Sequence, residues 1–180
     1  MVDDSILNKL NKVKVKLTEQ EVLNRLLDRM RWPKNYLSGQ PSVEAIKEDG
    51  TKHQDFFDED LYLNSARAVK CYEEGYSLIL SNIGGFNRDT FLVQEVLNDH
   101  FQKRINCNFY FGNGLKSVSF EKHNHDYPVI VKNIYGTSKW IIDKREVVLK
   151  DQDVIWFEKD TDHQVIEISD AKLSMTCNVG

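Results

Sequence analysis

Residues 121–142 read EKHNHDYPVIVKNIYGTSKWII, in which two apolar runs flank Gly136. Short runs rich in β-branched and aromatic residues, bounded by glycine or aspartate, are typical of β-strands. The stretch therefore predicts strands over 128–135 and 138–142, joined by a turn at the glycine.

The same pattern continues in both directions from this stretch. Turn residues such as Gly112-Asn113-Gly114 and Asp151-Gln152-Asp153 separate further apolar runs. Eight strands at this spacing favour an antiparallel barrel or jelly roll over a parallel sheet. We predict a mainly β protein with N-terminal helices, folded as a double-stranded β-helix. Its strands are expected over 105–111, 115–122, 128–135, 138–142, 146–149, 154–158, 164–169 and 173–178.

The first 75 residues have a mainly helical pattern. Thr18 and Glu21 have the spacing of a capping box, and apolar residues follow at helical spacing until Pro33. Further helices are expected over 60–74 and 88–103. Residues 9–17 alternate Lys with apolar residues and could form a strand or a loose arm, whereas 36–57 is polar and turn-rich. The inward side chains of the two later helices are expected to be Leu61, Ala68, Cys71, Phe91, Leu92, Val96, Leu97 and Phe101.

The composition is that of one folded domain. The chain has 180 residues, of which 41% are hydrophobic and 29% charged, which excludes a disordered or low-complexity protein. No apolar run approaches the ~18 to 20 residues of a membrane span, and the N-terminus lacks the apolar stretch of a secretory signal. We predict a single domain over 1–180, with a helical region over 1–75 and the barrel over 76–180. The widely spaced Cys71, Cys107 and Cys177 predict reduced thiols and a cytoplasmic protein.

The charge distribution limits the expected partners. The 24 Lys and Arg against 28 Asp and Glu leave a net charge of −4, and aromatic residues do not interleave with a basic stripe, so neither a nucleic acid nor a membrane is predicted as a partner. Residues 143–170 hold four basic and nine acidic residues, which is most often a solvated face but would suit a basic peptide. A small molecule or a peptide is the expected substrate, and the N-terminal helices offer a surface for a homodimer.

Three of the five histidines carry the expected chemistry. His123 and His125 stand two residues apart, so in a strand their rings point to the same face. His163 follows an acidic turn 38 residues after His125, and an antiparallel fold can return it to the same rim. Imidazole suits Fe, Zn, Cu and Ni, and three such ligands leave coordination positions open for catalysis. A His-x-His pair alone is more often ordinary surface chemistry, and the third histidine favours a metal site.

Several motifs occur in order along residues 75–180. Asn108-Phe109-Tyr110 precedes His123-Asn124-His125-Asp126, then comes Gly136-Thr137-Ser138-Lys139-Trp140, and Asp153-Val154-Ile155-Trp156-Phe157 leads to His163. In this order the chain resembles the JmjC-like (Jumonji) oxygenases of the cupin fold. The resemblance implies a JmjC-like cupin core over 76–180 and a metal bound through His123 and His163. In most members that metal is Fe(II), which works with 2-oxoglutarate and O₂ to hydroxylate a substrate.

One departure from the family pattern concerns the metal ligands. His125 stands where the family has Asp or Glu, so a third neutral imidazole replaces a carboxylate and leaves the metal its full positive charge. Three-His cupins such as the thiol dioxygenases carry a set of this kind. Asp126 is the next residue and would point inward only at a bulge. We expect His125 to be the third ligand.

A second departure concerns the oxo acid. Ser138 occupies the place of the basic residue that grips the distal carboxylate of 2-oxoglutarate in many members, and Lys139 follows it. Asn133 and Tyr110 match strand positions that contact the oxo acid in some branches. The resemblance therefore implies Lys139, Asn133 and Tyr110 as cofactor-binding residues, although Lys139 could equally be a solvated lysine beside Trp140.

Three functions stay open at this point. The first is a dioxygenase of the JmjC-like type that depends on Fe(II), with 2-oxoglutarate use undecided. The second is a three-His cupin metalloenzyme without 2-oxoglutarate, acting as a dioxygenase, isomerase or lyase on a small anionic substrate. The third is a non-catalytic cupin binding module. A different divalent metal could replace iron in the enzymes.

Overall fold

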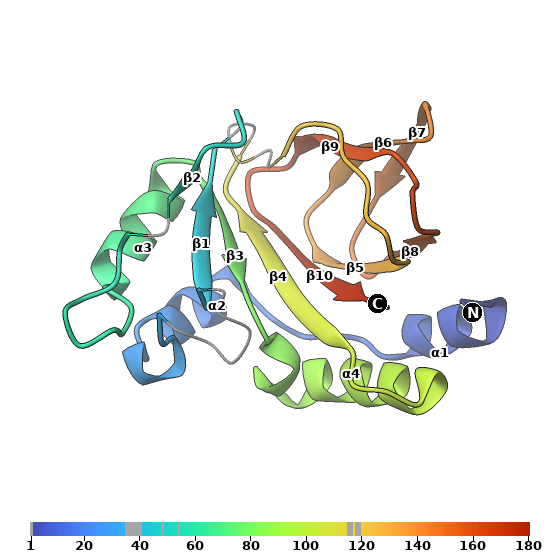
Figure 1. The fold of residues 1–180 in the computed structure, drawn as a ribbon, viewed down its shortest axis with the longest axis horizontal. Coiled ribbons are helices and arrows are strands. Elements are labelled where there is room, and N and C mark those ends of the chain that lie inside the picture. The colour runs from blue at the N-terminus through green and yellow to red at the C-terminus, as the bar shows by residue number, and fades with distance from the viewer. Residues whose placement is uncertain (1, 35–40, 48, 54, 115–116, 118–119) are drawn as a thin grey trace.

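The computed structural model describes residues 2–34, 41–47, 49–53, 55–114, 117 and 120–180. Two antiparallel β-sheets face one another, and helices cover the outer side of the larger sheet (Figure 1). The helices are α1 (Asp4–Lys12), α2 (Glu19–Leu26), α3 (Ser65–Glu73) and α4 (Arg88–Phe101), with the 3₁₀ turns η1 (Arg29–Arg31) and η2 (Ile83–Gly85).

The larger sheet has the strand order β2-β1-β3-β4-β10-β5-β8, and the smaller sheet has the order β7-β6-β9. All their pairings are antiparallel. In Figure 1, β10, β5 and β8 curve round to meet the smaller sheet, while β1 and β2 extend the larger one on its far side. The predicted double-stranded β-helix is therefore confirmed. The strands are β1 (Val43–Ile46), β2 (Lys52–His53), β3 (Ser77–Leu80), β4 (Asn106–Gly112), β5 (Val129–Tyr135), β6 (Ser138–Ile142), β7 (Arg145–Leu149), β8 (Val154–Phe157), β9 (His163–Ile168) and β10 (Lys172–Asn178).

One predicted strand of the barrel differs from the structure. Of the expected strand over 115–122, residues 115, 116, 118 and 119 lie outside the described residues, and the described remainder is not in a strand. Next to this segment, His123 alone pairs with His163 in an isolated antiparallel bridge. The first two histidines therefore lie on a short irregular segment rather than on a full strand. We call residues 120–128, which lead into β5, the crossing segment.

The first 75 residues differ in part from the expectations. Of the segment 9–17, expected as a strand or a loose arm, residues 9–12 belong to α1, because Asp3 caps this helix and Ile6 and Leu10, one helical turn apart, are completely buried. Residues 13–17 form neither a helix nor a strand, as the loose arm implied. The polar, turn-rich segment 36–57 also contains β1 and β2, which were not predicted. β1 pairs with β3, so strands from this region join the larger sheet.

The helix faces are partly as expected. The capping box of α2 is present at Thr18 and Glu21. Ala68 is buried as predicted, but Leu61 precedes α3 with a left-handed φ of 65° and is 47% exposed. On α4 the buried stripe runs through Thr90, Val93 and Leu97, and it leaves Phe91 and Leu92 exposed. The buried face of α4 is thus rotated about the helix axis relative to the predicted face, because it follows residues spaced three and four positions apart.

The interior consists of two hydrophobic clusters on opposite faces of the larger sheet. The main cluster lies between this sheet and the helices, and it includes Trp32, Phe109 and Phe111. A smaller cluster between the two sheets includes Trp140 and Phe157. Because side chains alternate along a strand, β5 contributes to both clusters, with Ile130 and Ile134 in the main one and Val129 and Val131 in the smaller one. The three cysteines are free thiols, and none of the described helices has the length and apolar character needed to cross a membrane.

Candidate metal centre

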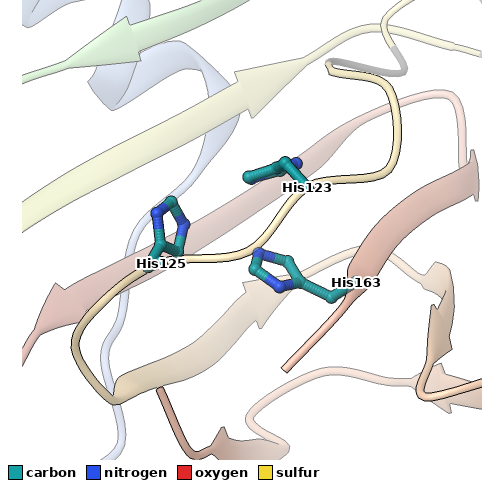
Figure 2. A group of neighbouring side chains, drawn as sticks. All are labelled: His123, His125 and His163. Carbon is teal, nitrogen blue, oxygen red and sulfur yellow. The ribbon is translucent and has the colours of Figure 1, made fainter. Parts of the chain in front are cut away.

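His123, His125 and His163 converge at one side of the space between the sheets (Figure 2). His163 is the first residue of β9, and the other two lie on the crossing segment that precedes β5. The main chains of His123 and His163 exchange two hydrogen bonds: each N–H donates to the other carbonyl, at 3.1 and 2.9 Å. The backbone N–H of Asp160 donates to the carbonyl of His125 at 2.7 Å. The backbone therefore fixes all three histidines relative to one another.

The donor atoms of the three rings lie within 4.8 Å of one another. The ring centroids are 4.4 Å apart for His123 and His163, 5.0 Å for His123 and His125, and 5.1 Å for His125 and His163. Imidazole nitrogens bind zinc at about 2.0 to 2.1 Å, so two nitrogens on one ion lie at most about 4.2 Å apart and a bound ion would draw the rings closer together. Asp126 does not belong to this group, as expected from its position one residue beyond His125.

Hydrogen bonds orient two of the rings. Nδ1 of His123 lies 2.8 Å from the carbonyl of Glu121, and Nδ1 of His163 lies 2.9 Å from the carbonyl of Thr161. A carbonyl can only accept, so Nδ1 carries a proton in both rings, and in the neutral ring Nε2 is the nitrogen with the lone pair. Metal-binding histidines are held in this way by a partner on the second nitrogen. The third ring, His125, stacks on Tyr127 with the ring planes 8° apart.

The surroundings of His125 and His163 favour the neutral form of these two rings. Burial, together with the neighbouring imidazoles, lowers the pKa of His163 to about 4, against the opposing effect of the hydrogen bond to Thr161. Burial and the nearby His123 also lower the pKa of His125. Neutral imidazole is the form that binds a metal, so His125 and His163 need to lose no proton near neutral pH.

The three histidines line a cavity between the sheets, together with apolar and polar side chains. Near His163 the wall of the cavity is aromatic. The ring centroids of Phe157 and Trp140 lie 4.3 and 6.3 Å from the centroid of the His163 imidazole. The apolar lining residues are Phe120, Val129, Val131, Trp140, Phe157, Val165 and Ile168. The polar lining residues, besides the histidines, are Ser77, Tyr110, Ser117, Lys172, Ser174 and Thr176.

Of the three expected cofactor-binding residues, the structure brings only Tyr110 to this cavity. Asn133 is buried outside it, and its side-chain amide donates to the carbonyls of Gly136 and Lys150. Lys139 points out of the barrel and pairs with Glu146 at 3.0 Å. In β5 the odd-numbered residues point into the barrel, whereas in β6 the even-numbered residues do. Asn133 and Lys139 are both odd-numbered, so they lie on different faces of the barrel wall.

Sequence reasoning missed the basic residue that does line the cavity. Lys172 begins β10, and Ser174 and Thr176 follow it on the same face. The available signal was a polar residue at every second position of an otherwise apolar strand, Lys172-Leu173-Ser174-Met175-Thr176. This alternation indicates one face against a core and one face toward something polar.

The comparisons with known proteins concern the fold. No protein-family model and no curated protein sequence matches the chain. Among solved structures, YcfD, a ribosomal oxygenase from Escherichia coli, aligns with 94% of this chain and 45% of its own, at a TM-score of 0.62 and 10% identity. The chain thus spans less than half the length of that protein. At this identity the likeness shows a shared fold.

Shorter matches include a protein from Photorhabdus luminescens, with 19% identity, a TM-score of 0.38, and coverage of 41% of this chain and 61% of that one. A cupin protein from Bacteroides fragilis has 18% identity, a TM-score of 0.37, and coverage of 46% and 70%. Structures similar to this chain thus include cupin proteins and an oxygenase.

Proposed function

We propose that the protein is a non-haem metal-dependent oxygenase of the JmjC-like cupin type, in which His123, His125 and His163 bind Fe(II). The observation that carries this proposal is the convergence of three imidazole donors within 4.8 Å at the wall of a cavity. The fold shared with a ribosomal oxygenase supports the assignment to this class. A small molecule or a peptide is the proposed substrate.

The donor set fits such a metal. Imidazole is a common ligand of iron in proteins, and a three-ligand site leaves positions open for O₂ and a substrate or co-substrate. When bound, iron would supply the activation of O₂ that an oxygenase needs to oxidise a C–H or thiol group.

The chain itself contributes orientation and exclusion of water. The carbonyls of Glu121 and Thr161 hold two rings with Nε2 free. Phe157 and Trp140 shield His163, which is only 4% exposed. The open side of the three rings faces the cavity, so a ligand there would meet the metal within an apolar wall.

We further propose 2-oxoglutarate as the co-substrate. The set of three histidine ligands favours a second candidate function, in which no oxo acid takes part. Three imidazoles supply no negative charge, so an anion bound directly to the metal would complete the site. A three-His cupin enzyme that takes a small anionic substrate, without any oxo acid, fits this observation. Of the three residues expected to bind the oxo acid, only Tyr110 lies in the cavity. Its hydroxyl would serve 2-oxoglutarate or a small anionic substrate equally.

Metal analysis tests the proposal directly. Protein purified under mild conditions and reconstituted with Fe(II) under anaerobic conditions should hold about one ion per chain, and His163→Ala and His123→Ala should lose it. His100→Ala is the matched control, because His100 lies on α4 outside the three-histidine group. Equal metal content in all four proteins would overturn the proposal.

The co-substrate is tested with the iron-loaded protein. Anaerobic addition of 2-oxoglutarate should produce a weak visible charge-transfer absorption, and air should then yield succinate. Retained iron without either signal, together with turnover of a chelating anionic substrate, would favour the second candidate.

A further inference from the structure

The three histidines differ in what holds their rings. The imidazoles of His123 and His163 each donate from Nδ1 to a main-chain carbonyl, at 2.8 and 2.9 Å. In both cases the carbonyl belongs to the residue two positions earlier in the chain, Glu121 or Thr161. Among the described residues, none forms a hydrogen bond with the ring of His125. The orientation of this third ring therefore needs another cause.

The main-chain bridge between the other two histidines explains the difference. By the same pattern, the carbonyl that would hold the ring of His125 is that of His123, two residues earlier. This carbonyl instead accepts the backbone N–H of His163 at 2.9 Å, as part of the reciprocal bridge. The pairing that fixes His123 and His163 thus engages the group that would orient His125.

An aromatic ring contacts His125 in place of a hydrogen bond. Tyr127 stands two residues after it, and the two ring planes are 8° apart with centroids 5.1 Å apart, which is the geometry of offset stacking. Within the described part of the chain, every other ring contact of the three histidines is tilted by 31° or more. Tyr127 therefore supports one flat face of the His125 imidazole.

Tyr127 is held by the protein interior and acts from behind the site. Its side chain packs against the smaller hydrophobic cluster, which includes Val129 and Phe157. It is not among the residues that line the cavity, whereas His125 is. The tyrosine ring therefore contacts the ligand residue and not a molecule bound in the cavity.

Such a contact is strong enough to matter for a metal. Removing the partner that orients a ligand ring typically weakens metal binding by about 10- to 100-fold. An aromatic pair contributes up to about tenfold to an equilibrium constant. Stacking on Tyr127 can thus supply for His125 much of what the two carbonyls supply for the other rings.

We propose that Tyr127 is the positioning residue for His125, so that ring stacking, and not a hydrogen bond, holds the third imidazole toward the metal. This inference rests on the proposed function, because it concerns the same metal site. It adds a residue outside the cavity to the group that determines metal affinity.

The first test measures metal affinity in two variants of Tyr127. Tyr127→Leu removes the flat ring but keeps an apolar side chain, and it should weaken Co(II) and Zn(II) binding by about 10-fold. Tyr127→Phe keeps the ring and removes only the hydroxyl, so its affinity should stay within about twofold of the wild-type value. Competition with a chromophoric chelator measures both affinities. The visible spectrum of bound Co(II), which reports the ligand geometry, should change in Tyr127→Leu as it does in His125→Ala, and should be unchanged in Tyr127→Phe.

Tyr76→Leu is the matched control. Tyr76 also contacts a histidine, since its ring meets that of His53 edge-on at 5.3 Å and 76°, but this pair lies outside the three-histidine group. The control should bind Co(II) about as tightly as the wild-type protein. A loss as large as that in Tyr127→Leu would attribute the effect to a general loosening of the fold and contradict the proposal.

A second test needs no metal. In the metal-free protein the stacked tyrosine ring should shift the carbon-bound proton resonances of His125, which are assigned by their absence from the NMR spectrum of His125→Ala. Tyr127→Phe should keep the shifted positions, and Tyr127→Leu should move them to those of an unstacked histidine. The resonances of His123 and His163 should change little, because their carbonyl partners remain.

The outcomes separate this inference from the proposed function. Wild-type affinity and spectrum in Tyr127→Leu, or an equal loss in Tyr127→Phe, would overturn the role of Tyr127 and leave the metal site standing. A wild-type protein that binds neither ion would overturn the proposed function, and with it the role of Tyr127 in metal affinity. The NMR comparison would then still decide whether Tyr127 orients His125, and unshifted wild-type resonances would refute that as well.

Discussion

The two sheets of the barrel differ in what covers their outer faces. Helices cover the larger sheet, so Phe109 and Phe111 are completely buried while Tyr110, between them, faces the cavity. The outer face of the smaller sheet is open, and Val148 and Ile166 are 50% and 39% exposed. Burial of apolar area is the main source of stability. The larger sheet therefore stabilises the fold, and the smaller sheet completes the site with His163.

Substituting one large side chain in each sheet should show this difference most strongly. Phe111→Ala removes a buried ring that stacks on Tyr72 with centroids 4.1 Å apart, and should lower the free energy of unfolding by about 3 to 5 kcal/mol. Val148→Ala, on the open face, should change it by less than about 0.5 kcal/mol. Urea unfolding of both variants measures the two values. Similar losses would show that the sheets share the stability equally.

The cavity face of the larger sheet should behave unlike its helix-covered face. Without ligand, Lys172→Met should stabilise the protein by about 2 to 4 kcal/mol near pH 6, because an unpaired buried charge is removed. Lys172 has a pKa of about 7 when folded and 10.5 when unfolded. Between these values the unfolded chain binds the extra proton, so wild-type stability rises with pH and the gap to the variant closes.

Unfolding by urea at pH 6, 8 and 10 checks this pH dependence. Tyr110, the titratable side chain on the neighbouring strand, stays protonated over this range because burial raises its pKa, and it is present in both proteins. A gap that stays constant with pH would refute the assignment of the buried charge to Lys172.

Metal binding should stabilise the smaller sheet more than the larger one. Zn(II) at about 100 times its dissociation constant should add about 2.7 kcal/mol to the free energy of unfolding. Hydrogen exchange should slow in β6 and β9, next to His163, and change little in β1 and β3. His163→Ala should show neither effect. Uniform slowing over both sheets would contradict the division of roles.

The turn between the two sheets should give the smallest effect. Gly136 joins β5 to β6 with a φ of 74°, and a Cβ there would lie 2.1 Å from the carbonyl oxygen of Ala171. Gly136→Ala should therefore cost about 2 kcal/mol, from backbone strain and this contact. Gly50→Ala is the control, because its φ of 79° is similar and nothing lies within 4 Å. It should cost about 1 kcal/mol, and equal losses would exclude the contact as a cause.

The sequence predicted most of the barrel because its signals are local. Strands such as 138–142 are bounded by glycine or aspartate turns, and the structure places β6 over the same residues. β1 could not be predicted in this way, since it sits in a polar segment and is stabilised by pairing with β3 more than thirty residues later. α1 was missed because the Lys and apolar alternation after Lys9 obscured the helical pair Ile6 and Leu10.

The site was predictable to a similar extent. His123 and His125 were expected on one face, and the return of His163 after one turn needs only antiparallel pairing. The oxo-acid candidates depended on which face of each strand points inward, and the change of phase at Gly136 is not visible in the sequence. For Lys172 the alternation along β10 was visible in the sequence, but that its polar face points into the barrel follows only from the pairing of β10 with β4 and β5.

The reciprocal main-chain hydrogen bonds between His123 and His163 have one more consequence. Two donors forty residues apart in sequence are spaced by the sheet itself, so they keep their positions when an ion departs. Little conformational entropy is left to lose when an ion returns. The rate of uptake should then follow how quickly each metal sheds its hydration water, and nickel, which does so slowly, should load later than zinc.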